Sequence, residues 1–190
     1  MARYNGPGDG IDDAWDVAAS PDGSRVYVTG SSLGADTDDD AATIAYDAAT
    51  GAKVWATRYD GPAHLSEGAN AIAVDTAGTV YVAGYTFVSQ AESDMLALAY
   101  NGSTGTQEWV GTYVGTGGSS GGGWIGVDPG GQRVFVTGSS LGSGTGNDIA
   151  TVAFSSAGGS VDWVDVYNGP DSQSDDPYGW RWRRTDRRST

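Results

Sequence analysis

A short phrase that begins with tyrosine and has glycine two positions later returns along this chain at nearly constant intervals. The four copies begin at Tyr4, Tyr59, Tyr113 and Tyr167. Successive copies are 55, 54 and 54 residues apart, and self-similarity at such a period indicates stacked supersecondary units. The predicted units are three complete repeats at 4–59, 60–113 and 114–167, with the start of a fourth at 168–179.

Each repeat has the pattern of four short strands joined by turns. Those of the first repeat are predicted at Trp15–Ala19, Arg25–Ser31, Ala41–Tyr46 and Val54–Arg58. Apolar and polar residues alternate in these segments, glycine is abundant (31 of 190), and no 3.6-residue apolar period appears. Four antiparallel strands in about 40–55 residues match one blade of a β-propeller. A Greek-key sandwich would not explain the strict period, so we predict an all-β partial propeller.

Tryptophan recurs with the same period at the start of the fourth predicted strand. The three copies are Trp55, Trp109 and Trp163. We expect each indole to fill the wedge between neighbouring sheets, where a large aromatic ring buries much apolar area. Their role is therefore predicted to be structural.

The segment Ala45–Trp55 has the form A-x-D-x-x-T-G-x-x-x-W. It resembles the tryptophan-docking motif of pyrroloquinoline-quinone-type propellers, although the second copy has Asn101 in place of Asp, and the third keeps little beyond Ala, the second Gly and Trp. With the Y-N-G-P and V-Y-V-T-G phrases, the repeat also resembles the seven-bladed β-propeller repeats of secreted bacterial proteins. This resemblance covers residues 4–179 and implies an extracellular or periplasmic location. No signal peptide is recognisable at the N-terminus.

The formal charge of −14 argues against nucleic acid or an anionic membrane as a partner. The chain has no cysteine, so neither disulfides nor thiolate metal sites are available. Five of its ten basic residues lie within 180–190.

Residues 180–190 depart from the repeat just where a strand of the Val17–Ala18 type should follow. Written as codons, Gly179–Arg187 can encode V-A-V-A-P-D-G-S in a shifted frame, which matches Val17–Ser24 closely. We therefore predict one domain over 1–179, and an out-of-frame, disordered tail at 180–190 in place of a basic binding arm.

Two segments, Gly30–Gly34 and Gly138–Gly142, match the G-x-S-x-G nucleophile elbow of hydrolases. An elbow requires a following helix and a histidine base. A Gly/Asp-rich loop is predicted to follow instead, and the single histidine, His64, lies in another repeat. We predict no catalytic residues and no enzyme.

Carboxylates recur immediately before the third strand of each repeat, at Asp40, Asp94 and Asp148. A carboxylate present in every blade is expected to accept hydrogen bonds from turn amides, which is a structural role. In the first repeat Asp36 and Asp38 precede Asp40, and together they offer the oxygen ligands that Ca²⁺ prefers. A single calcium site at Asp36, Asp38 and Asp40 is therefore a candidate, against the alternative of a solvated acidic loop; no other cofactor is predicted.

The loops between the fourth and first strands, and between the second and third, are long and share one face of a propeller. We expect a binding surface there, with Trp15 and Trp124 at the entry to the first strands. The Gly117–Gly123 run is predicted to be a flexible connection.

Three functions stay open at this point. The first is a non-catalytic scaffold that binds protein or carbohydrate through the long-loop face. The second is part of a quinoprotein dehydrogenase-like enzyme, and the third is a truncated product without independent function. Open blade edges would also permit self-association.

Overall fold

The structure, a computed structural model, describes residues 3–170 and 174–175, and every regular element in that part is a strand. The strands are rich in Val, Thr, Ala and aromatic residues, which suit a pleated, half-buried surface. Their bounds are β1 Asp12–Ala19, β2 Arg25–Leu33, β3 Asp39–Asp47, β4 Lys53–Tyr59, β5 Glu67–Val74, β6 Thr79–Phe87, β7 Ser93–Asn101, β8 Gln107–Tyr113, β9 Ser120–Val127, β10 Arg133–Gly142, β11 Gly146–Ser155 and β12 Val161–Tyr167. The predicted tail 180–190 and most of the predicted fourth repeat lie outside the described residues.

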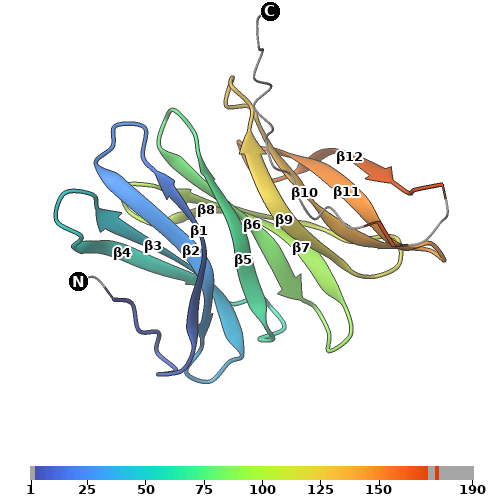
Figure 1. Ribbon diagram of the computed structural model, residues 1–190, viewed down its shortest axis with the longest axis horizontal. Coiled ribbons are helices and arrows are strands. Elements are labelled where there is room, and N and C mark those ends of the chain that lie inside the picture. Colours follow the sequence, from blue (N-terminus) through green and yellow to red (C-terminus); the bar gives the residue numbers. More distant parts are fainter. Residues whose placement is uncertain (1–2, 171–173, 176–190) are drawn as a thin grey trace, which may run out of the picture.

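The twelve strands form three four-stranded antiparallel sheets in chain order, β1–β4, β5–β8 and β9–β12. Each sheet is a simple meander, and the three stand in sequence across the molecule (Figure 1). The prediction of an all-β chain with three four-stranded blades is therefore confirmed. We refer to the sheets as blades 1, 2 and 3.

The strands are longer than the sequence pattern predicted. Pairing between β2 and β3 continues past the predicted ends through Ser32↔Asp40 and Leu33↔Asp39. The long loop that we expected between these strands is consequently only residues 34–38. Polar side chains at Ser32, Asp39 and Asp40 interrupt the apolar alternation that predicts a strand, whereas an antiparallel ladder extends wherever backbone groups can pair.

The first strand of each blade contains a β-bulge, which shifts its register against the second strand. In blade 1 the bulge lies between Ala14 and Asp16, and Gly30 is its partner on β2. A Cβ at Gly30 would lie 1.8 Å from the carbonyl oxygen of Asp13, so only glycine fits. Gly84 and Gly138 meet the same obstacle in their own blades.

The hydrophobic core consists of two layers, each between neighbouring blades. The layer between blades 1 and 2 includes Tyr27, Trp55 and Leu98, and the layer between blades 2 and 3 includes Tyr81, Trp109 and Phe154. The sheets thus bury their faces against one another, and the outward faces of blades 1 and 3 have no neighbouring sheet among the described residues.

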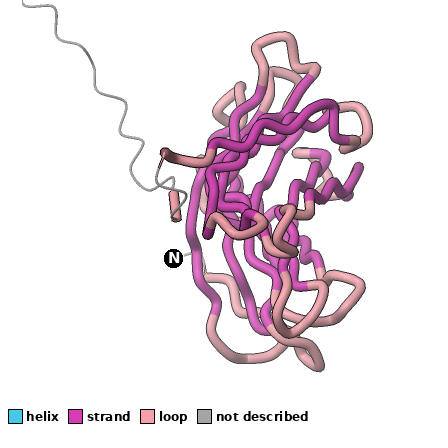
Figure 2. Tube along the Cα trace, turned by 90° about the vertical axis from the view of Figure 1, so that its right-hand side faces the viewer, coloured by secondary structure: helices cyan, strands magenta, loops and turns pink. Residues whose placement is uncertain are grey.

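The innermost strands lie closest together. β5 packs against both β1 and β9, whereas the outer strands β8 and β12 meet at few positions. The sheets therefore fan out from their first strands, as propeller blades do, and Figure 2 shows this arrangement of strands and loops from the side. No helix among the described residues is long and apolar enough to cross a membrane.

Candidate functional site

A groove of about 770 Å³ runs along the inner strands in the described part of the protein. It lies where β6 and β10 end and β7, β9 and β11 begin, which is the face of the loops that join successive blades. We call it the inner groove, and its side chains include Trp15, Asn70, Tyr85, Phe87, Trp124 and Asn147, with Ser93, Ser119 and Ser139. The groove thus lies on the face that the sequence predicted for a binding surface and includes both predicted tryptophans.

Aromatic rings form one part of the groove wall. Tyr85 and Phe87 meet edge to face, with ring centroids 5.8 Å apart and planes at 89°. Trp15 stands at the bulge of β1 with 60% of its surface exposed. Burial, followed by the nearby charges of Asp39 and Glu67, raises the pKa of Tyr85, so its hydroxyl stays neutral.

Polar side chains on the groove wall tie blade 2 to blade 3. The Asn70 amide donates to the carbonyl oxygen of Gly122 at 2.8 Å, and the Ser93 hydroxyl donates to that of Ser120 at 3.1 Å. Ser120 in turn donates to the carbonyl oxygen of Tyr113 at 2.6 Å and accepts from the amide of Met95 at 3.0 Å. The wall is therefore rigidly hydrogen-bonded.

Three consecutive glycines form the floor of the groove. Gly121, Gly122 and Gly123 belong to β9, where the first two pair with Ser139 and Gly138. We had predicted a flexible connection over Gly117–Gly123, and this was wrong for its second half, which continues the ladder. Missing side chains here leave the recess open between blades 2 and 3.

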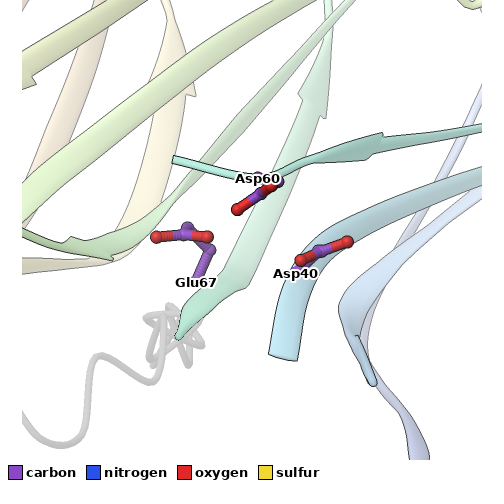
Figure 3. Close-up of side chains that lie close together, drawn as sticks. All are labelled: Asp40, Asp60 and Glu67. Carbon is purple, nitrogen blue, oxygen red and sulfur yellow. The ribbon is translucent and has the colours of Figure 1, made fainter. Parts of the chain in front are cut away.

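Three carboxylates from different segments meet between blades 1 and 2. Asp40 is the second residue of β3, Asp60 follows β4 and Glu67 begins β5, and one oxygen of each lies within 4.8 Å of the others. Figure 3 shows the three side chains converging from these strands. We call this set the carboxylate cluster.

Most oxygens of the cluster already have partners. Asp40 pairs with Arg58 at 2.8 Å and accepts from the Thr37 hydroxyl at 3.0 Å. Glu67 accepts from the Gly61 amide and the Thr86 hydroxyl, each at 2.9 Å. Asp60 binds His64 through one oxygen at 2.6 Å, while its other oxygen is buried without a hydrogen bond.

Such a set fits Ca²⁺ poorly, because that ion requires six to eight oxygen ligands. An arginine lies against one carboxylate, and burial raises the pKa of Glu67, with the negative charges of Asp60 and Asp40 adding to the shift. Glu67 is fully buried. The cluster is better described as a polar network that fixes the junction of blades 1 and 2.

The candidate calcium ligands predicted from sequence are not brought together. Asp36 and Asp38 are exposed in the loop at 34–38, whereas Asp40 is buried and turned to Arg58. Asp60 and Glu67 were missed by sequence reasoning. The signal in the sequence was the repeat itself, which aligns Glu67 with Asp12, 55 residues earlier. In the structure these two carboxylates pair with hydroxyl residues of the second strand, Thr86 and Ser32 respectively.

The repeated carboxylates Asp40, Asp94 and Asp148 are all buried at the start of their strands. We expected them to accept from turn amides, but Asp40 and Asp148 accept from threonine hydroxyls, Thr37 and Thr145, at 3.0 Å. Asp94 and Asp148 each keep one buried oxygen without a hydrogen bond. Burial raises the pKa of Asp94.

The Gly138–Gly142 segment lies within β10, and Gly30–Gly34 belongs to β2 except for Gly34, which follows the strand. Their central serines, Ser32 and Ser140, are buried, and the Ser32 hydroxyl donates to Asp12. The flanking glycines are explained by packing, since a Cβ at Gly34 would meet the Thr37 hydroxyl at 1.8 Å. No helix follows either segment within the described residues, so neither has the geometry of an elbow.

No protein-family model matches the sequence, and no curated protein matches it. Among solved structures, the chain is similar to the quinohemoprotein alcohol dehydrogenase ADHIIG of Pseudomonas putida HK5, with 19% identity and a TM-score of 0.56. The match covers 81% of this chain and 26% of that one. The β-propeller domain of the Trilobed protease from Pyrococcus furiosus also matches, with 9% identity, a TM-score of 0.44, and coverage of 81% and 43%. The chain thus spans about a quarter of the dehydrogenase, and this likeness concerns the fold alone.

Proposed function

We propose that this protein is a non-catalytic binding module whose inner groove takes a neutral, hydroxyl-rich ligand of the carbohydrate class. One observation carries the proposal: none of the described residues that line the groove has a charged side chain, although the chain as a whole has a net charge of −14. A surface kept free of charge in so acidic a protein is suited to an uncharged ligand.

The chemistry of the lining supports a sugar over a purely apolar ligand. Aromatic faces such as those of Trp15 and Tyr85 can pack against the C–H faces of a pyranose. Asparagine and serine side chains offer both hydrogen-bond donors and acceptors, which match sugar hydroxyls. The groove volume of about 770 Å³ also lies within the range of small-molecule sites.

The same lining gives no support to a catalytic function. Glycoside hydrolysis uses two carboxyl groups that flank the bond to be broken, and the described residues of the groove lining include none. The similarity to the alcohol dehydrogenase concerns the fold alone. We extend the proposal to an extracellular or periplasmic location, where such ligands are encountered.

The proposal is tested by titrating the protein with neutral and uronic-acid oligosaccharides under calorimetry. Neutral sugars should bind more tightly than their uronic counterparts, because the acidic protein repels anions. Trp15→Ala should weaken binding by about tenfold, equivalent to about 1.4 kcal/mol. Trp163→Ala is the matched control, since it removes another exposed indole, on the outward face of blade 3.

Two results would contradict the proposal. One is the absence of binding by every neutral oligosaccharide in a panel that covers the common hexoses, pentoses and amino sugars. The other is binding that Trp15→Ala and Trp163→Ala weaken equally, since this would place the ligand outside the inner groove.

A further inference from the structure

Neighbouring blades are joined by the same indole contact at both internal interfaces. The Trp55 indole N–H donates to the carbonyl oxygen of Gly102 at 2.9 Å, and that of Trp109 donates to Ser156 at 2.7 Å. Gly102 and Ser156 hold the same position in their blades, directly after the third strand. Each blade therefore inserts a tryptophan into a turn of the next blade.

The receiving turn has a glycine against the ring. Gly105 and Gly159 have φ of +75° and +71°, and a Cβ there would lie 2.7 Å and 2.5 Å from the indoles of Trp55 and Trp109. The turn thus offers a flat surface that a side chain would destroy. An aromatic residue of the second strand backs each indole, with ring centroids 5.7 Å apart for Tyr27 and Trp55.

Blade 3 presents the third indole with the same geometry, but none of the described residues forms a receiving turn against it. Phe135 backs Trp163 with centroids 5.9 Å apart and planes at 38°, the same values as for Tyr81 and Trp109. Trp163 is nevertheless 43% exposed, against 8% for Trp109. The donor side of a third interface is therefore already formed.

Blade 1 presents the matching receiver. Gly51 has φ of +71°, as Gly159 does, but nothing lies within 4 Å of its Cβ position. Ala48 occupies the turn position of Gly102 and Ser156. On the same face Val17 is 60% exposed, whereas its counterpart in blade 2, Ile72, is 7% exposed.

We propose that the outward face of blade 3 docks onto the outward face of blade 1 of a second copy of this chain, head to tail. In this contact Trp163 lies on Gly51 of the second copy and donates to the carbonyl oxygen of its Ala48. The contact repeats what the two internal interfaces already do with the same residue types. A heterologous contact closes into a ring or continues into longer assemblies, and two copies supply six blades, within the range of closed propellers.

The N-terminal segment sets a condition on this contact. Tyr4 already lies against blade 1, where its hydroxyl accepts from Arg58 at 3.2 Å. By the repeat it occupies the place that Tyr167 of the second copy would take, and both tyrosines begin the phrase Y-N-G-P. Docking therefore exchanges one tyrosine segment for an equivalent one, so Tyr4→Ala should strengthen association.

Sedimentation velocity over a range of protein concentrations tests the pairing. The wild type should show concentration-dependent association, and Trp163→Ala should remain monomeric. Trp15→Ala should associate as the wild type does, because its indole lies in the inner groove. Loss of sugar binding by Trp15→Ala with intact association would separate this inference from the proposed function.

The glycine turn provides a second test with a matched control. Gly51→Ala should abolish association by placing a Cβ where the indole must lie. Gly23→Ala carries similar backbone strain, since its φ is +70°, but its counterparts Gly78 and Gly131 contact nothing within 4 Å at the internal interfaces. Gly23→Ala should therefore associate normally.

Mixing distinguishes a head-to-tail contact from a symmetric one. Trp163→Ala keeps an intact receiver and Gly51→Ala keeps an intact donor, so each variant alone should be monomeric while their mixture forms a dimer. A monomeric wild type at all concentrations would overturn the proposal and leave the face to another occupant, such as a further blade in the same chain. Association that survives Trp163→Ala, or a mixture that stays monomeric, would also overturn it.

Discussion

Arg58 and Asp40 form an ion pair at 2.8 Å between β4 and β3, and only 18% and 8% of their side chains are exposed. The guanidinium also reaches the carbonyl oxygen of Ser32 at 2.5 Å and the hydroxyl of Tyr4 at 3.2 Å. It is the cation that lies against the carboxylate cluster. The junction of blades 1 and 2 therefore depends on a single arginine that the other blades replace by Thr112 and Val166.

Replacing this arginine should destabilise the protein strongly. Arg58→Met leaves Asp40 buried beside two other carboxylates, and breaking a buried pair from one side typically costs about 3–5 kcal/mol. The free energy of unfolding in urea measures the loss. Arg133→Met is the control, because Arg133 and Asp162 are 46% and 32% exposed and such pairs contribute about 1 kcal/mol or less. Equal losses would show that Arg58 does not neutralise the cluster.

Glu67 should make the protein less stable as pH rises. Its pKa is raised in the folded state, so the folded chain holds this proton more tightly than the unfolded chain does. Its contribution is fully present below the ordinary glutamate pKa and is lost as pH rises through the folded pKa. Glu67→Gln should remove this component of the pH dependence of urea unfolding, because an amide can still accept from Gly61 and donate to Thr86.

A carboxylate with the opposite shift provides the control for Glu67. Hydrogen bonds from the Ser20 hydroxyl and then the Ser24 amide and hydroxyl lower the pKa of Asp22 to about 2. Its contribution is present above the ordinary aspartate pKa and is lost as pH falls towards 2. Asp22→Asn should therefore alter the acid limb of the stability profile only. A Glu67→Gln profile parallel to that of the wild type would contradict the assignment.

The repeated tryptophans should differ in their contribution to the stability of the monomer. Trp109→Ala removes an indole that is 8% exposed and should cost about 3–5 kcal/mol. Trp163→Ala removes one that is 43% exposed and should cost about 1 kcal/mol. Both are measured by urea unfolding at a concentration where sedimentation shows monomer only. Equal costs would mean that Trp163 is already packed within its own chain.

The bulge glycines should tolerate no side chain. Gly138→Ala places a Cβ 1.9 Å from the carbonyl oxygen of Gly121, so β9 and β10 must separate and the variant should lose several kcal/mol of stability or fail to fold. Gly126→Ala, in the same sheet with nothing within 4 Å, should be tolerated. Thermal unfolding compares the two. A stable Gly138→Ala would show that the bulge can shift its register.

The sequence by itself determined the period, the four strands of each blade and the residues that join blades. Tyr, Trp and the turn glycine (Gly51, Gly105 and Gly159) recur every 54 or 55 residues because every blade meets the same structural requirement, so a local pattern reports a repeated contact. Trp55 and Trp109 lie at the predicted interfaces. The ends of β2 and β3 were missed, since Ser32 and Asp40 pair through their backbones and do not continue the alternation of apolar and polar side chains that marks a strand.

Only the tertiary structure decided where the repeats depart from one another. Asp60 and Glu67 occur once each at their repeat positions, and they meet Asp40 only because β5 of blade 2 packs beside β3 of blade 1. The inner groove likewise arises where Trp15 of one blade and Gly122 of another face the same space. Tertiary structure also explains why Trp163 is exposed and why nothing packs on the turn at Gly51: among the described residues no blade lies next to either. The repeat in the sequence specifies the residues of the contact between neighbouring blades. Whether a given tryptophan or glycine turn makes that contact depends on which blades lie side by side in the tertiary structure.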